Sequence, residues 1–381
     1  MNIFKCSNMN RSFKLPILWC SCVTLIAISL LCPAASADED GQDLLSIFGN
    51  ADMNDRIDEA DATYVQAVID GMSKATKLSD ANIDGRIDSQ DIERINEIIR
   101  GEETELTVSD SIGRNVTVSL PVKSIIALGT YRNEAAKILK AQDMMVGVSS
   151  DIKEGYYYQD LADKPAVGTW SAPDSEAIVK LKPDIVITSA NLDRATLLEE
   201  SLRPAGIAVL GLDLYREDIM RSEMRTLGFI LDKNEEADEY LQWRGSYDQA
   251  IHDYVAGLNE YPKLDSEWIL KENPDVIIKL LAPGGGKAGW NSTKEADQVL
   301  NGYLEERPGW SNLDASKNNR VHLLSTEIAW GPDGIVGLAY CTAWLHPEMD
   351  IDPEKIYREY LEQFLEVEYP EGAVLGYPVT A

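Results

Sequence analysis

The sequence predicts a mixed α/β fold in which two lobes with parallel sheets are joined by one long helix and preceded by a small all-α module. Three observations lead to this prediction. Short apolar runs alternate with segments of helical periodicity from about residue 106 onward, which is the pattern of a parallel sheet covered by helices. One helix–strand unit occurs twice, which indicates two similar lobes. A duplicated acidic loop near the N-terminus sets the first module apart.

The first 37 residues have the features of a signal peptide. A basic stretch containing Lys5 and Arg11 is followed by the apolar run 15–31 and by the small residues 35–37, which form a cleavage pattern. An uncleaved membrane anchor is the alternative, because the apolar run is nearly long enough to span a bilayer. We therefore expect an exported protein at the cell surface, in the periplasm or in the medium.

Composition argues against one class of partner and one kind of stabilisation. The formal net charge of −29 opposes nucleic-acid binding, which depends on Lys and Arg side chains that neutralise phosphates. Four of the five cysteines lie in the leader, so the remaining chain holds Cys341 and no disulfide framework. We interpret Cys341 as a buried small hydrophobic residue.

Two acidic loops, at 50–61 and 80–91, predict calcium binding. Each has oxygen-bearing side chains at its first, third, fifth and twelfth places and an isoleucine at its eighth. Calcium takes about six to eight oxygen ligands, and this spacing turns them toward one centre. The expected ligands, which include the backbone carbonyl of the seventh place, are Asn50, Asp52, Asn54, Arg56 and Asp61 in the first loop and Asp80, Asn82, Asp84, Arg86 and Asp91 in the second.

We expect the second loop to bind calcium more strongly. Gly85 stands at its sixth place, where the backbone takes a positive φ, whereas the first loop has Asp55 there and begins with Asn50. The 30-residue repeat, the twelfth-place aspartates and a helix expected only after each loop resemble a dockerin over residues 41–102. This resemblance implies a calcium-folded module that docks to a cohesin. A purely structural calcium clip is the alternative.

Behind a short acidic linker, a helix–strand unit occurs twice. Residues 174–187 contain Asp-Ser-Glu, a short helix, Pro-Asp and an apolar strand, and residues 265–278 repeat this order. Asp or Ser can cap the helix, the glutamate suits the positive end of its dipole, and proline ends it. A long helix over 234–258 separates the two copies. The predicted boundaries are 1–37 for the leader, 41–102 for the calcium module, 106–232 for the N-terminal lobe, 233–259 for the linking helix and 260–381 for the C-terminal lobe.

The candidate ligand site follows from where the strands end. Ligands of open parallel sheets bind beyond the carboxyl ends of the strands, so we expect the residues after the apolar runs to meet the ligand. These are Thr130, Tyr131, Arg132, Trp170, Asn191, Trp290 and Trp330. Their aromatic rings offer flat apolar faces to a bulky ligand, and Arg132 is the candidate partner of a ligand carboxylate.

From about residue 106 to 368 the chain resembles the class III substrate-binding proteins of ABC importers, the iron-siderophore and cobalamin group. The matching stretches, in chain order, are DSIGR at 110–114, KSIIALG at 123–129, VGTWSAP at 167–173, LKPDIVI at 181–187, RPGW at 307–310, NRVHL at 319–323 and WLHPE at 344–348. The resemblance implies two Rossmann-like lobes and a non-enzymatic protein that delivers a metal chelate, such as an iron siderophore, to a permease and its ATPase. Cobalamin or haem is the alternative ligand.

The same resemblance implies a docking role for Glu176 and Glu267, one in each lobe, on the two permease subunits. One departure from the family concerns the second lobe. The family has a strand, a loop and a helix between the linking helix and the second unit, whereas here residues 257–262 lead almost directly into it. We therefore expect the sheet of the second lobe to be truncated.

Two other classes of function stay open. A scaffold protein that acts only through a cohesin is one, and a dockerin-borne carbohydrate-active enzyme is the other. An enzyme would need two facing carboxylates or an activated nucleophile, and no motif singles out such a set. His252, His322 and His346 lack the spacing of metal ligands, so direct zinc capture is not expected.

Overall fold

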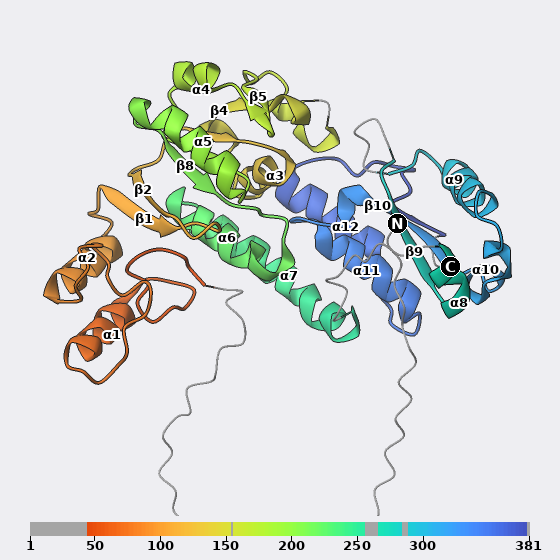
Figure 1. Ribbon diagram of the computed structural model, residues 1–381, viewed down its shortest axis with the longest axis horizontal. Coiled ribbons are helices and arrows are strands. Elements are labelled where there is room, and N and C mark those ends of the chain that lie inside the picture. The colour runs from red at the N-terminus through yellow and green to blue at the C-terminus, as the bar shows by residue number, and fades with distance from the viewer. Residues whose placement is uncertain (1–43, 154, 256–265, 284–288, 379–381) are drawn as a thin grey trace, which may run out of the picture.

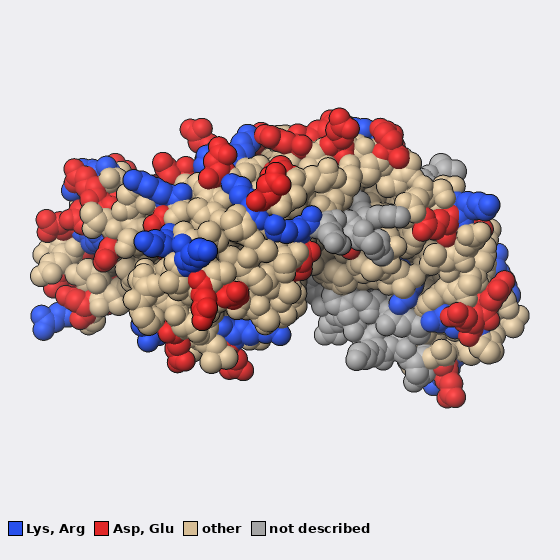
Figure 2. Space-filling view, turned by 90° about the horizontal axis from the view of Figure 1, so that it is seen from above, with Lys and Arg blue, Asp and Glu red and all other residues tan. Residues whose placement is uncertain are grey.

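The computed structural model describes residues 44–153, 155–255, 266–283 and 289–378. The predicted signal peptide therefore lies outside the described residues. Figure 1 shows the calcium module at one end of an elongated molecule, the N-terminal lobe beside it and the C-terminal lobe at the other end. In the face shown in Figure 2, acidic and basic side chains are interspersed and do not form one large patch of either sign.

The calcium module contains two helices, α1 (Glu59–Ile69) and α2 (Ser89–Arg100). Each begins inside its loop with a reciprocal cap. Asp58 accepts a hydrogen bond from the Ala60 amide at 2.8 Å, while the twelfth-place carboxylate of Asp61 accepts one from the Asp58 amide at 2.9 Å. Asp88 and Asp91 repeat this arrangement before α2. The sequence predicts a helix after each loop, and in the described residues each helix begins within the last places of its loop and continues beyond it.

The N-terminal lobe is built on a parallel sheet of order β4-β3-β7-β8. Its strands are β3 (Ile125–Ala127), β4 (Met145–Val148), β7 (Ile185–Thr188) and β8 (Ala208–Gly211). Alternate residues of these strands enter two different apolar cores, one on each face of the sheet. Strands buried on both faces are continuous apolar runs, which is why the sequence located them.

Helices cover both faces of this sheet (Figure 1). They are α3 (Thr130–Ile138), α4 (Ser175–Leu181), α5 (Leu192–Leu202) and α6 (Glu217–Ile230). Two short antiparallel pairs complete the lobe, β1 (Glu105–Ser109) with β2 (Asn115–Ser119) and β5 (Gly168–Thr169) with β6 (Ala172–Pro173). Short 3-10 turns include η3 (Tyr156–Leu161).

The linking helix α7 (Asn234–Val255) leads to a C-terminal lobe with a smaller sheet. Its order in the described residues is β11-β10-β9, where β9 (Ile277–Leu281) and β10 (Val321–Ser325) are parallel and β11 (Gly376–Tyr377) is antiparallel. The helices are α8 (Ser266–Glu272), α9 (Thr293–Glu305), α10 (Asp314–Lys317), α11 (Gly334–Leu345) and α12 (Pro353–Tyr360). Three strands of this sheet lie in the described residues, and the segment 257–262, on which the predicted truncation rests, lies outside them.

The two predicted helix–strand units lie in different sheets, one leading to β7 and the other to β9. Each helix ends at a residue with left-handed backbone directly before the proline, Lys182 at φ 52° and Asn273 at φ 43°. The predicted fold class, two α/β lobes joined by one helix, is therefore confirmed. The two lobes are also connected by packing, because α11 packs on α7 and the segment after α12 contacts α3.

Candidate functional site

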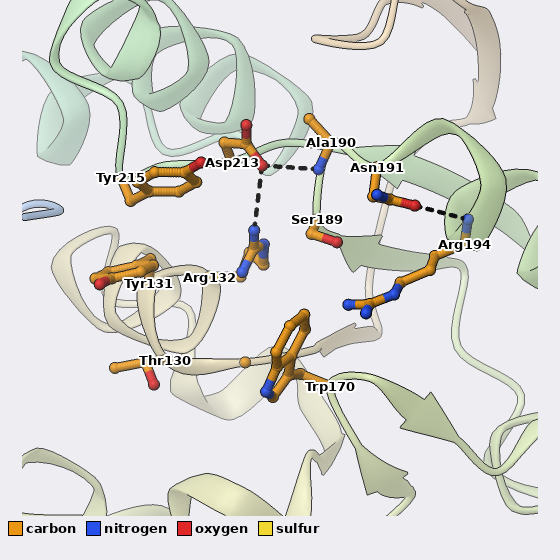
Figure 3. Close-up of a pocket in the computed structure, with 11 residues that line it drawn as sticks. Thr130, Tyr131, Arg132, Trp170, Ser189, Ala190, Asn191, Arg194, Asp213 and Tyr215 are labelled. Atoms are coloured by element: carbon orange, nitrogen blue, oxygen red, sulfur yellow. Dashed lines mark hydrogen bonds and ion pairs between the residues drawn. The ribbon is translucent and has the colours of Figure 1, made fainter. Parts of the chain in front are cut away.

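A cavity of about 560 Å³ opens at the carboxyl edge of the N-terminal sheet (Figure 3). It is formed by the start of α3, the loop between β5 and β6, and the segments that follow β7 and β8. Its lining residues are Gly129, Thr130, Tyr131, Arg132, Trp170, Ser189, Ala190, Asn191, Arg194, Asp213 and Tyr215. Five of the seven residues that the sequence proposed for the ligand site lie here.

Arg132 makes its polar contacts within the protein. Its side chain is buried, its Nε donates a hydrogen bond to the Leu212 carbonyl at 2.8 Å, and its guanidinium lies 3.6 Å from Asp213. Asp213 also accepts a hydrogen bond from the Ala190 amide at 2.9 Å. Burial lowers the pKa of Arg132, and the Asp213 carboxylate opposes that shift. Arg132 therefore ties together the segments after β7 and β8, and is not a free partner for a ligand carboxylate.

Arg194 is the cation that the pocket offers to a ligand. Its guanidinium carbon lies 4.7 Å from the ring centre of Trp170, which is a cation–π contact. Trp170 is 43% exposed, and its backbone amide donates a hydrogen bond to Asp151 at 2.8 Å. Asn191 caps α5 by accepting from the Arg194 amide at 3.1 Å. No carboxylate pairs with the Arg194 guanidinium within the described part of the chain.

Two tyrosines meet the C-terminal lobe at the edge of this pocket. The rings of Tyr131 and Tyr215 lie 5.6 Å apart, and the Gly331 amide donates to the Tyr215 carbonyl at 3.4 Å. Gly331 has φ +89°, and a Cβ there would collide with the Tyr131 ring. Glycine at this place therefore lets a loop of the C-terminal lobe approach the pocket wall.

The other two predicted aromatic residues are not among those that line the cavity. Trp290 is 3% exposed and lies in the core of the C-terminal lobe, where its backbone pairs with Val374. Trp330 is half-buried and packs against the main core next to Gly331. Arg194, Asp213 and Tyr215 line the cavity but are not among the residues predicted from the sequence. Asn191, which was predicted, could have pointed to Arg194. A residue that caps a helix at the pocket places the first turn of that helix beside the pocket, and Arg194 lies in the first turn of α5.

A buried polar cluster lies between α3 and the C-terminal helices. The hydroxyls of Tyr157 and Tyr357 lie 2.6 Å apart, Tyr157 donates to Asp333 at 3.4 Å, and Tyr360 donates to Glu134. Burial raises the pKa of Glu134 to about 8. These groups hold the two lobes together and do not line the cavity.

Glu176 and Glu267, the predicted permease contacts, occupy matching places. Both are exposed and lie in the first turns of α4 and α8. Asp174 caps α4 and accepts hydrogen bonds from the amides of Glu176 at 3.0 Å and Ala177 at 3.1 Å.

The calcium loops present an all-oxygen donor set. In the second loop, the Asp84 amide donates to Asp80 at 3.2 Å and to Asn82 at 2.9 Å, so these two side chains turn toward the inside of the loop. Asp91 closes it by accepting from the Asn82 amide at 3.2 Å. No group of three or more His, Cys, Asp or Glu side chains in the described ranges is arranged to hold a metal. Besides carboxylates, the two loops offer asparagine side-chain and backbone oxygens, and hard oxygen donors of this kind suit calcium.

Two α/β lobes on one connecting helix, with a pocket at the edge of one sheet, are similar in architecture to periplasmic substrate-binding proteins. Residues 125–255 match the family model described as "Periplasmic binding protein". An uncharacterised ABC transporter substrate-binding lipoprotein, YvrC of Bacillus subtilis, is 21% identical over 290 residues, which cover 64% of this chain and 86% of that protein.

Solved structures extend the comparison to the whole two-lobed part. The TroA-like periplasmic binding protein FepB of Veillonella parvula matches with a TM-score of 0.59 and 18% identity, over 72% of this chain and 99% of its own. The molybdate-binding protein MolA of Haemophilus influenzae matches with a TM-score of 0.53 and 18% identity, over 69% and 98%. The lobes therefore have the TroA-like, class III substrate-binding fold. The matched proteins carry the names of periplasmic or transporter substrate-binding proteins, which are not enzymes, and this agrees with the prediction of a non-enzymatic binding protein.

Proposed function

We propose that this chain is an exported solute-binding protein that captures an anionic metal chelate, such as an iron siderophore or another ferric complex, and delivers it to an ABC importer. The observation that carries the proposal is the cation–π pairing of Arg194 with the partly exposed Trp170 in a cavity of about 560 Å³. Proteins of this fold hold different ligands, since MolA is bound to molybdate and CeuE of Helicobacter pylori is in a complex with nickel and histidine.

The pocket itself therefore has to indicate the ligand class. A flat aromatic face beside a cation suits a bulky ligand that carries negative charge, because the ring supplies apolar contact and the guanidinium supplies a charge-assisted hydrogen bond. Tyr215, 41% exposed, offers a second apolar face in the same cavity. Cobalamin and haem remain alternative ligands of the same fold.

Delivery would use Glu176 and Glu267. Their exposure and their equivalent positions in the two lobes suit contacts with two permease subunits, as the resemblance to importer proteins implies. In the described residues no helix is long and apolar enough to cross a bilayer.

Tryptophan fluorescence titration tests the ligand proposal. We expect quenching by one of ferric siderophores, ferric citrate, haem or cobalamin, and Arg194→Ala to weaken binding of an anionic chelate by about tenfold or more, since a charged hydrogen bond is lost. Arg203→Ala is the matched control, because Arg203 is an exposed arginine near the end of the same helical segment and pairs with Glu199. No response to any ligand, or equal effects of both variants, would refute the proposal.

We propose in addition that the two loops bind calcium and that the module around them docks to a cohesin. The converging oxygens and the exposure of Glu59, Ala60, Ser89 and Gln90 support this second function, because these four residues stand where dockerins select their partner. Calcium-dependent binding to a panel of cohesins is the test. Cohesin binding without any chelate binding would favour the scaffold, and hydrolysis of a polysaccharide panel would favour an enzyme.

A further inference from the structure

The predicted calcium module is joined to the hairpin β1–β2 by direct backbone contacts of its first residues. Ile47 forms an antiparallel bridge with Val108 of β1, the Phe48 amide donates to Thr107 at 3.0 Å, and the Ser109 amide donates to Ser46 at 2.9 Å. Residues 44–48 thus extend the hairpin β1–β2. Leu45 and Ile47 are at most 1% exposed and belong to the main core of the protein.

The same segment is anchored to α6. The Ser46 amide donates to the Thr226 hydroxyl at 3.1 Å, and the Ser222 hydroxyl contacts Ser46 at 3.4 Å. These contacts join residues about 180 positions apart in sequence. The segment before the first loop is therefore a structural part of the lobe.

Asn50, the leading residue of the first loop, connects this segment to the loop interior. It is fully buried, and its Nδ2 donates to the carbonyls of Leu45 at 2.7 Å and Asn54 at 2.8 Å. Its Oδ1 accepts from the Asn54 amide at 3.2 Å and so faces the expected calcium position. An aspartate has no N–H and would place a carboxylate against two carbonyl oxygens. This explains why the first loop begins with asparagine.

Asp55, at the sixth place of the first loop, makes a second connection. Its carboxylate lies 3.9 Å from Arg225 on α6, and Arg225 pairs with Asp238 of the linking helix at 2.7 Å. The second loop differs at both places. Asp80 accepts hydrogen bonds from the amides of Asp84 and Gly85 within its own loop, at 3.2 and 2.9 Å.

We propose that calcium bound in the first loop fastens the module to the N-terminal lobe through Asn50, whereas calcium in the second loop does not. This inference rests on the proposed calcium binding. A cation held by the Asn50 Oδ1 fixes the orientation of the side chain, so its Nδ2 keeps the Leu45 carbonyl in place and the segment 44–48 stays on β1. Because such coupling is reciprocal, docking of the strand must also raise the calcium affinity of the first loop.

Hydrogen exchange of the Phe48 and Ser109 amides in the purified full chain, with calcium or with chelator, tests the proposal. Both amides form hydrogen bonds in the joint between residues 44–48 and β1, so their protection directly reports the opening of this joint. We expect calcium to raise this protection in the wild type and in Asp91→Asn, but not in Asp61→Asn. The two variants are matched, because each removes the twelfth-place carboxylate and the same capping contact from one loop.

Asn50→Asp separates calcium binding from the joint. Calorimetry is expected to show calcium still bound to the first loop, while the calcium-dependent gain in protection falls about fivefold, the effect of losing the hydrogen bond to the Leu45 carbonyl. A full gain in Asn50→Asp, or a lost gain in Asp91→Asn, overturns the inference. Absence of calcium uptake by either loop overturns both this inference and the proposed calcium binding, but leaves the ligand pocket untouched.

Discussion

Asp213→Asn is expected to leave the buried Arg132 guanidinium without its counter-charge while keeping an acceptor for the Ala190 amide. Breaking a fully buried ion pair costs about 3–5 kcal/mol. The pair here is looser, since its atoms lie 3.6 Å apart, the Asp213 side chain is 12% exposed, and the Leu212 carbonyl remains bonded to Arg132 at 2.8 Å. We therefore expect a loss of about 2–3 kcal/mol.

Urea unfolding followed by circular dichroism measures this loss. The matched control is Asp218→Asn, which breaks the exposed pair of Asp218 with Arg216 and is expected to cost under about 0.5 kcal/mol. Arg132→Met combined with Asp213→Asn should recover part of the loss, because no buried charge then remains unpaired. Equal costs for Asp213→Asn and Asp218→Asn, or strictly additive losses in the double variant, would refute the reasoning.

Three further predictions concern pH and transport. Burial raises the pKa of Glu134 from 4.5 to about 8. The stability that the neutral carboxyl contributes below pH 4.5 is therefore lost as the pH rises toward 8, by about 2–4 kcal/mol. In thermal unfolding experiments, Glu134→Gln should lack this pH dependence. Burial lowers the pKa of His322 from 6.5 to about 4, so the stability that the neutral imidazole contributes above pH 6.5 is lost as the pH falls toward 4. His322→Phe keeps an aromatic ring stacked on Trp344, and its unfolding temperature should vary less over this pH range. Glu176→Arg and Glu267→Arg should change the chelate affinity by no more than about twofold, but should lower the chelate-stimulated ATPase activity of the importer by about tenfold. Unchanged stimulation would show that these two residues have no docking role.

The strands and the repeated unit could be predicted from sequence because their signals are local. β4 begins and ends where its apolar run does, and a proline marks the end of each short helix before β7 and β9. Buried strands need apolar side chains on both faces, and this requirement is visible in any single stretch.

The site could be predicted only in part, because its remaining members meet through contacts between distant segments. Arg194 and Asp213 come together with Arg132 only when three strand ends converge. Trp290 comes after an apolar strand in the sequence, as a pocket residue would, but its backbone pairs with Val374 and its side chain lies in the core of the C-terminal lobe. The contact of residues 44–48 with β1 has no local signal, since a single bridge to a distant hairpin leaves no periodic pattern.

A crystal structure of the protein with the chelate that quenches its fluorescence is the most direct test of the central claim, that the carboxyl edge of the N-terminal sheet holds the ligand. We predict the chelate in the cavity, with its flat face on Trp170 and an anionic group within hydrogen-bond distance of Arg194. A chelate found outside this cavity, or a cavity left empty in crystals grown at a saturating concentration, would contradict the account.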